Sequence, residues 1–157
     1  HRQVFVTDLN DKDAASEVVM KLLYLHSEDR KSPITLFIDS PGGAVTNAMA
    51  IADTMNCLTC PVSTVGLTQV AGIAVWILAT GSRGQRRWAR NCKIEIPPLL
   101  HGDSDGERIT RTLATLVDRL ASRTLLSEDD VVRFLREGYE FSFDGVLKAG
   151  LIDVSYD

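Results

Sequence analysis

Residues 34–49 read ITLFIDSPGGAVTNAM, and this stretch decides the fold. Ile34–Ile38 is a short, nearly continuous apolar run, which is typical of a strand covered by helices. Ser40–Gly43 forms a glycine turn directly after it. Apolar residues then repeat at helical spacing, at Val45, Ala48, Met49, Ala52 and Met55. Glycines allow backbone N–H groups at a helix N-terminus to turn toward an oxyanion, although a tight turn needs them equally for its backbone angles.

The same order of elements recurs along the chain. Val62–Leu67 is strand-like, Gln69–Gly72 is a turn region, and Ile73–Thr80 is an apolar helix. Gln3–Thr7 and Asp13–His26 precede them as a strand and an amphipathic helix. Strands that alternate with helices predict an α/β fold with right-handed crossovers, here in a single domain over residues 1–157.

The second half of the chain carries a hairpin pattern and several capped helices. A hairpin over Arg87–Ile96 is predicted to turn at Arg90 and Asn91 and to end at Pro97, since proline cannot donate to a ladder. The remaining predicted elements are a helix from Glu107 to Leu120, a helix over Glu128–Glu137 with a Ser127–Asp130 capping box and a stop at Gly138, a helix over Ser142–Gly150, and a strand over Leu151–Val154.

Composition and charge indicate an ordinary globular protein without a nucleic-acid or membrane partner. The chain has 157 residues, 45% of them hydrophobic, and a formal net charge of −4. The basic run at Arg83, Arg86, Arg87 and Arg90 is interpreted as a solvated face beside a turn. The apolar stretch Val70–Ala79 is about half of the ~20 residues needed to span a bilayer, so it is read as a buried helix.

The three cysteines, Cys57, Cys60 and Cys92, are too few for a disulfide framework and favour a reducing compartment. The Cys57–Cys60 spacing matches a redox or zinc half-site. With no second cysteine pair and no nearby histidine, the two are instead expected to pack as small residues at a helix end. The sequence therefore predicts no metal and no cofactor.

Three long segments resemble the ClpP family of self-compartmentalised serine proteases. They are ITLFIDSPGGAVTNAMAIADTM at 34–55, CPVSTVGLTQVAGIAVWILATGSRGQRRWARN at 60–91, and FSFDGVLKAGLIDV at 141–154. The resemblance covers nearly the whole chain in the same order. It implies a ClpP/crotonase-like (ββα) superhelix with a handle helix. It also implies a heptameric ring, two of which stack as a tetradecamer around a closed chamber.

The resemblance also places the catalytic triad, whose serine, histidine and aspartate act together. These positions fall on Gly72, Pro97 and Gly138, and none of these residues carries a reactive side chain. The resemblance thus implies a non-catalytic subunit of the ClpR type, best known from plastids and cyanobacteria. The turn formed by Ser40, Pro41, Gly42 and Gly43 is then expected to persist as structure, with no oxyanion to stabilise.

Two further departures from the family concern its contacts. The segment between Pro97 and the Glu107 helix is shorter than in typical members, in the handle region where rings meet, and Glu137 replaces an arginine that couples the rings. Positions that are commonly aromatic in the pocket for the AAA+ Clp chaperone map to Thr35, Phe37 and Cys57. Docking of the chaperone at this subunit is therefore expected to be weak.

The implied partners are active ClpP-type subunits and other ClpR-type subunits, in a plastid such as the chloroplast stroma or, alternatively, in a bacterial or cyanobacterial cytosol. The chain opens at His1 without a leader and without the family's N-terminal axial loop, which favours a processed product. Two alternatives stay open. One is an active hydrolase that uses Ser63 or Ser82 with His101, and the other is a crotonase-like acyl-CoA enzyme on the same fold.

Overall fold

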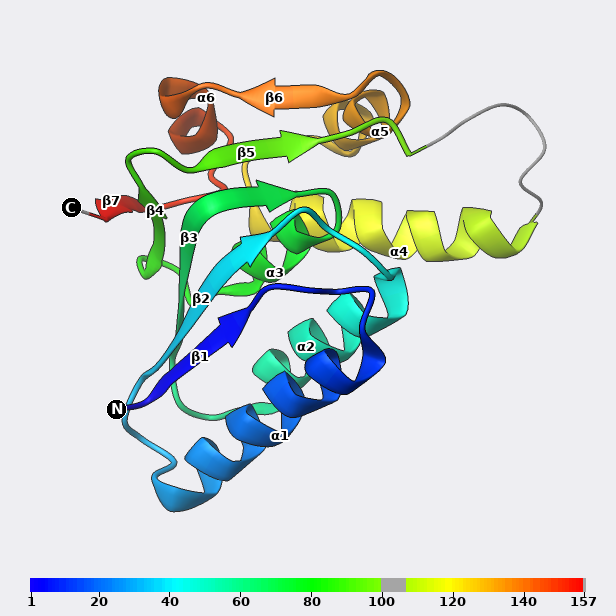
Figure 1. Cartoon of the computed structure of the whole chain (residues 1–157). Helices are drawn as coiled ribbons and strands as arrows, with labels where there is room; N and C mark the ends of the chain where they lie inside the picture. The colour runs from blue at the N-terminus through cyan, green and yellow to red at the C-terminus, as the bar shows by residue number, and fades with distance from the viewer. Residues whose placement is uncertain (100–106, 157) are drawn as a thin grey trace.

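The computed structural model describes residues 1–99 and 107–156, which form one seven-stranded sheet and six helices (Figure 1). This arrangement confirms the predicted α/β class. The elements are β1 (Gln3–Val6), α1 (Lys12–Glu28), β2 (Ile34–Ser40), α2 (Val45–Cys57), β3 (Val62–Ala71), α3 (Ala74–Thr80), β4 (Arg86–Ala89), β5 (Lys93–Ile96), α4 (Glu107–Arg123), α5 (Glu128–Glu137), β6 (Tyr139–Phe141), α6 (Phe143–Lys148) and β7 (Val154–Tyr156).

The sheet divides at the long strand β3. Five strands run parallel in the order β1-β2-β3-β4-β7. The second half of β3 pairs instead with β5, which pairs antiparallel with β6. The register between β2 and β3 shifts between Ile38 and Ser40, so that Ser40 lies opposite Val70. The carboxyl ends of β2 and β3 therefore meet beside β5.

The predicted hairpin over residues 87–96 is wrong. β4 pairs with Thr64–Gly66 and β5 pairs with Gln69–Ala71, both in parallel with β3. Because β3 is ten residues long, one of its edges accommodates both short strands in succession. The strand prediction for 62–67 also stopped short, since β3 continues through Gln69 to Ala71. Alternating apolar residues indicate a strand but do not specify its partner.

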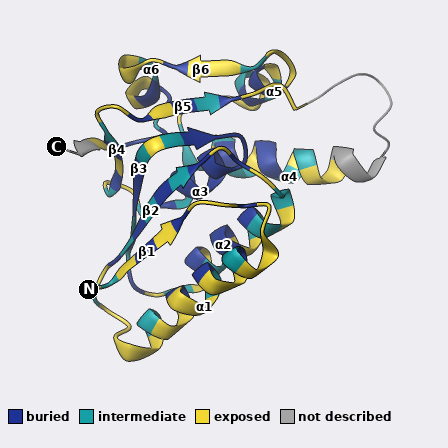
Figure 2. Ribbon diagram, in the orientation of Figure 1, coloured by how far each residue is buried: buried dark blue, intermediate teal, exposed yellow. Residues whose placement is uncertain are grey.

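The core lies between the sheet and the helices. Ile34, Leu36 and Ile38 of β2 are fully buried, whereas Thr35 and Phe37 on the other face are only half-buried. Every residue of α3 up to Ala79 is buried, as expected from its apolar sequence. Figure 2 shows exposed residues along the outer side of α1 and buried ones toward the sheet. No helix among the described residues is long and apolar enough to span a membrane.

The predicted boundaries of α5 are confirmed in detail. The Ser127 side chain accepts a hydrogen bond from the Asp130 amide, and the Asp130 carboxylate accepts one from the Ser127 amide. Gly138 ends the helix with a φ of 78°. The strand β6 that follows was not predicted, because three residues are too few for a periodic pattern to emerge.

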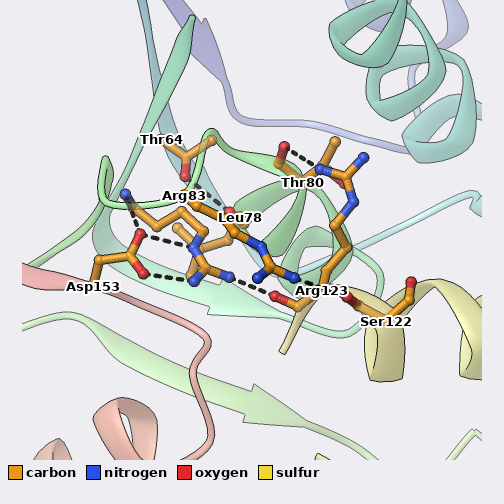
Figure 3. A network of polar contacts seen from close by, with 8 residues as sticks. Thr64, Leu78, Thr80, Arg83, Ser122, Arg123 and Asp153 are labelled. Carbon is orange, nitrogen blue, oxygen red and sulfur yellow. Dashed lines mark hydrogen bonds and ion pairs between the residues drawn. The ribbon is translucent and has the colours of Figure 1, made fainter. Parts of the chain in front are cut away.

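A buried ion pair joins β4 to the C-terminal segment and corrects the interpretation of the basic run. Arg86 is 5% exposed, and its Nε and Nη2 donate to the two carboxylate oxygens of Asp153 at 2.9 and 2.6 Å. The Arg86 amide donates to the same carboxylate, and Nη1 donates to the Arg123 carbonyl at 2.9 Å (Figure 3). Arg83, Arg87 and Arg90 are exposed, but Arg86 is a buried structural residue.

We predict that Asp153→Asn lowers the free energy of unfolding by on the order of 3 kcal/mol at neutral pH, because it leaves Arg86 buried without its counter-charge. Burial opposes ionisation of Asp153, but the hydrogen bonds from Arg86 outweigh it and lower the pKa of the carboxyl below 3.8. The stabilisation is therefore present above about pH 4 and is lost as the pH falls through the folded-state pKa.

Urea unfolding at about pH 7 and about pH 3 measures this effect. The difference in unfolding free energy between the native chain and Asp153→Asn is expected to narrow at the lower pH. Asp118→Asn, which removes an exposed carboxylate on α4, is the matched control and should change stability little. A gap of equal size at both pH values would contradict the prediction.

Candidate functional site

The turn after β2 is held by close backbone contacts that only glycine allows. Gly42 and Gly43 have φ values of 104° and 146°. A Cβ at Gly42 would lie 3.0 Å from the Ala71 carbonyl oxygen, and one at Gly43 would lie 2.6 Å from the Leu9 carbonyl carbon. Real Cβ atoms essentially never approach backbone as closely as at Gly43, and the contact at Gly42 is tighter than most, so packing as well as conformation favours glycine at both positions.

Polar groups of the turn are used to hold it together. The Ser40 side chain is fully buried, and its Oγ accepts a hydrogen bond from the Gly42 amide at 3.3 Å. The Leu9 carbonyl accepts from the Ala44 amide at 3.1 Å and from Nδ2 of Asn47 at 2.9 Å. The turn thus joins the β1–α1 connection to the start of α2.

Of the three positions that the resemblance assigned to a catalytic triad, Gly72 lies beside this turn and contacts the second, Pro97. Gly72 directly follows β3, and a Cβ there would lie 3.9 Å from both the Gly42 Cα and the Pro97 Cγ. Pro97 directly follows β5. A Cβ at Gly138 would lie 2.8 Å from the Cδ of Pro98, the neighbour of Pro97. The structure therefore places Gly72 beside Gly42 and Pro97, and it places Gly138 beside Pro98, the residue that follows Pro97.

The two glycines of this group differ in how much room they have. Around Gly72 the nearest atoms are at ordinary contact distance, and its φ of 53° is in the left-handed region. Gly138 has φ 78° and ψ 153°, a combination that is essentially restricted to glycine, and Pro98 fills the space in front of it. A side chain therefore fits at Gly72 at the cost of some strain, but not at Gly138 without a change of backbone.

Sequence reasoning missed a polar network beside these residues. Nε2 of Gln69 donates to Glu95 at 3.1 Å, and Nζ of Lys93 lies 2.7 Å from Glu95 and 3.3 Å from Glu140. The Lys93 hydrogen bond lowers the pKa of Glu95, and the Glu95 hydrogen bond raises the pKa of Lys93. Both groups stay charged at neutral pH, which makes them poor proton shuttles. The sequence signal that could have revealed part of this network is the i, i+2 spacing of Lys93 and Glu95, which puts both side chains on one face of the strand.

The cysteines are free thiols in different surroundings. Cys60 and Cys92 are buried, but Cys57 is exposed at the end of α2, so the prediction that Cys57 and Cys60 pack as small residues at a helix end is wrong for Cys57. Burial, with the charge of Asp39 as a second cause, raises the pKa of Cys92 to about 12 and keeps it protonated. The described residues include no cluster of three metal-ligating side chains.

The serines of the displaced-nucleophile alternative lie at the far end of β3 from the glycine turn. The Ser63 hydroxyl donates to Oε1 of Gln85 at 2.7 Å, and the Ser82 hydroxyl accepts from the Val62 amide at 3.0 Å. Both hydroxyls have structural partners beside the first residues of β3, whereas Gly72 follows its last residue. His101, the proposed base, lies outside the described residues.

The residues predicted to contact the chaperone or the opposing ring lie on three elements. Phe37 and Thr35 share one face of β2, and Cys57 ends α2. Sequence reasoning missed Phe5, which is 57% exposed and stacks on Phe37 with ring centroids 5.1 Å apart. Glu137 is exposed at the end of α5. The predicted contraction of the handle falls mainly on residues 100–106, outside the described residues.

A parallel α/β fold with a glycine turn at the carboxyl ends of its central strands is the scaffold of many hydrolytic sites. The chain matches the family model described as Clp protease over residues 1–155. It belongs to this Clp protease family, a serine peptidase family whose members form rings with other Clp subunits.

We predict that Gly43→Ala destabilises the fold by on the order of 3 kcal/mol, because its Cβ would overlap the Leu9 backbone. Gly72→Ala should cost only about 1 kcal/mol, the penalty of a left-handed conformation with open space around it. Chemical denaturation of the two variants measures the difference. Equal losses of stability would contradict the proposed role of Gly43 as a contact between two backbone segments.

Proposed function

We propose that this chain is a non-catalytic, ClpR-type subunit of an ATP-dependent Clp protease core. The observation that carries the proposal is that Gly72 lies beside Gly42 and Pro97, with Gly138 against Pro98, the neighbour of Pro97. The places where a nucleophile, a base and its orienting acid would cooperate hold two glycines and a proline. The site has the position of an active centre in the fold without the groups that perform the reaction.

Serine peptidases depend on all three groups. Loss of the nucleophile or base alone lowers kcat by about 10⁶ in a well-studied case, and the remaining acceleration comes from the oxyanion hole and substrate binding. Here the nucleophile position lacks a hydroxyl, and the proline at the base position neither accepts nor donates a proton. The steric closure at Gly138 further supports the proposal, since Pro98 occupies the space that a carboxylate would need.

An inactive subunit contributes to the protease complex through its contacts with other subunits. We place it in a heptameric ring with active ClpP-type and other ClpR-type subunits, two rings stacking as a tetradecamer, in a plastid. This part of the proposal is supported by the sequence resemblance. The exposed Glu137 would alter the contact between rings by reversing a charge. Chaperone docking at Thr35, Phe37 and Cys57 would be weak, with the exposed Phe5 and the half-buried Phe37 supplying the aromatic area that remains.

We predict that a fluorophosphonate probe labels neither the purified chain nor its Gly72→Ser variant. The variant regains a hydroxyl but has no neighbouring base to activate it. An active ClpP-type subunit, labelled in parallel, shows that the probe is competent. Labelling of the native chain that disappears in Ser63→Ala or Ser82→Ala would contradict the proposal and support a displaced nucleophile.

We further predict that the chain co-assembles with an active ClpP-type subunit. Native mass spectrometry of co-expressed subunits is expected to show mixed rings of seven subunits, with the peptidase activity of each ring depending on its active members. A variant of the active partner without its own serine serves as the control, and rings containing it should be silent. Recovery of this chain only as a separate species would contradict the proposed role.

A further inference from the structure

A pocket of about 240 Å³ lies between α2, α3 and α4, and neither Gly42 nor Gly43 is among its lining residues. Its walls are mostly apolar: Ala48, Met49 and Ala52 from α2, Ile73, Trp76 and Ala79 around α3, and Leu116 and Leu120 from α4. Ala48 and Ala52 are one helical turn apart and face α3, so their short side chains leave space where larger residues would fill the helix contact.

The rim of the pocket is polar and basic. Arg119 and Arg123 from α4 are among the described lining residues, which include no carboxylate. Arg119 forms an ion pair with Asp53 just outside the lining. Arg123 donates to the Thr80 carbonyl and to Asn56, as Figure 3 shows in part. The lining therefore carries two guanidinium groups, of which Arg119 is paired with a carboxylate and Arg123 donates to neutral groups.

The arginine side chains are positioned before any ligand binds. The backbone carbonyl of Arg123 accepts from the buried Arg86, which ties this end of α4 to β4. Its side chain bridges α3 and α2 through Thr80 and Asn56. An arginine that is already ordered loses less conformational freedom when it binds an anion, and its planar fork suits a carboxylate.

We infer that this pocket binds a small amphiphile with an aliphatic chain and a carboxylate head, such as a medium-chain fatty acid. The chain would occupy the apolar space against Trp76 and Ala52, and the carboxylate would meet Arg119 and Arg123 at the rim. The volume lies somewhat below the range of about 300–1,000 Å³ for drug-sized ligands, which selects a short chain. The inference stands apart from catalysis and ring assembly, since it uses none of the residues assigned to them.

Tryptophan fluorescence gives a direct measurement of ligand binding at this pocket. Trp76 lines the pocket and Trp88 does not. In Trp88→Phe, Trp76 is the only tryptophan left, and the substitution removes an indole N–H that has no hydrogen-bond partner among the described residues. Titration of this variant with octanoate, below its micelle concentration, is expected to change the Trp76 fluorescence in a saturable manner. 1-Octanol should bind about tenfold more weakly, because it cannot form the charge-assisted hydrogen bonds.

Two substitutions in the Trp88→Phe background test separately how the carboxylate head and the aliphatic part of the ligand contribute to binding. Arg119→Gln should weaken octanoate binding about tenfold and reduce its dependence on salt. Arg111→Gln removes the same charge from an exposed site two turns away on α4 and should have no effect. Ala52→Leu fills the pocket and should abolish binding of both probes, with circular dichroism confirming that the variant is folded.

The outcomes that overturn the inference are distinct. Absence of a saturable response to octanoate shows that the pocket does not take the ligand. Equal binding of octanoate and 1-octanol, or equal effects of Arg119→Gln and Arg111→Gln, shows that the arginines do not bind the carboxylate head. Unchanged binding in a folded Ala52→Leu variant places the ligand elsewhere.

Discussion

The backbone contact at Gly42 and Gly43 is the constraint on which the rest of the structure depends. At this point the end of β2, the β1–α1 connection and the end of β3 approach one another without room for a Cβ atom. The contact fixes where α2 begins, through the Leu9 carbonyl, and where Gly72 lies relative to β2. The glycine motif would be required here even in a protein with no chemistry to perform. Its presence is evidence for the fold and not for catalysis.

Much of the fold could be predicted because local signals agree with it. Helical spacing in α1, α2 and α5, the Ser127 cap and the glycine turn all follow from interactions within a few residues. The partners of β4 and β5 could not be predicted, because the alternation of buried and exposed residues along these strands is the same whichever strand they pair with. The burial of Arg86 depends on Asp153, which is 67 positions away in the sequence. Nothing near Arg86 distinguishes it from its exposed neighbours.

For the candidate site as well, one part could be predicted from the sequence and another part could not. The resemblance assigned Gly72, Pro97 and Gly138 to the site, and the structure places Gly72 beside Pro97 and Gly138 beside Pro98. The obstruction at Gly138 was beyond sequence reasoning, since it arises from where β5 delivers Pro98. The ion pairs around Glu95 and the stacking of Phe5 on Phe37 likewise join strands whose register must be known first. Residues contributed by different strands are the ones for which a single sequence carries least information.

Gly138 has a structural role that its backbone conformation and packing define. Its amide closes α5 by donating to the Phe134 carbonyl at 2.8 Å, and its backbone then adopts angles that are essentially limited to glycine. Pro98 packs into the space this leaves, next to Ile96 at the end of β5. An aspartate in this place would need a different backbone and the removal of the Pro98 contact. Under the proposed non-catalytic function, an active site would require several coordinated changes, because an aspartate at Gly138 alone would lose stability before any activity was gained.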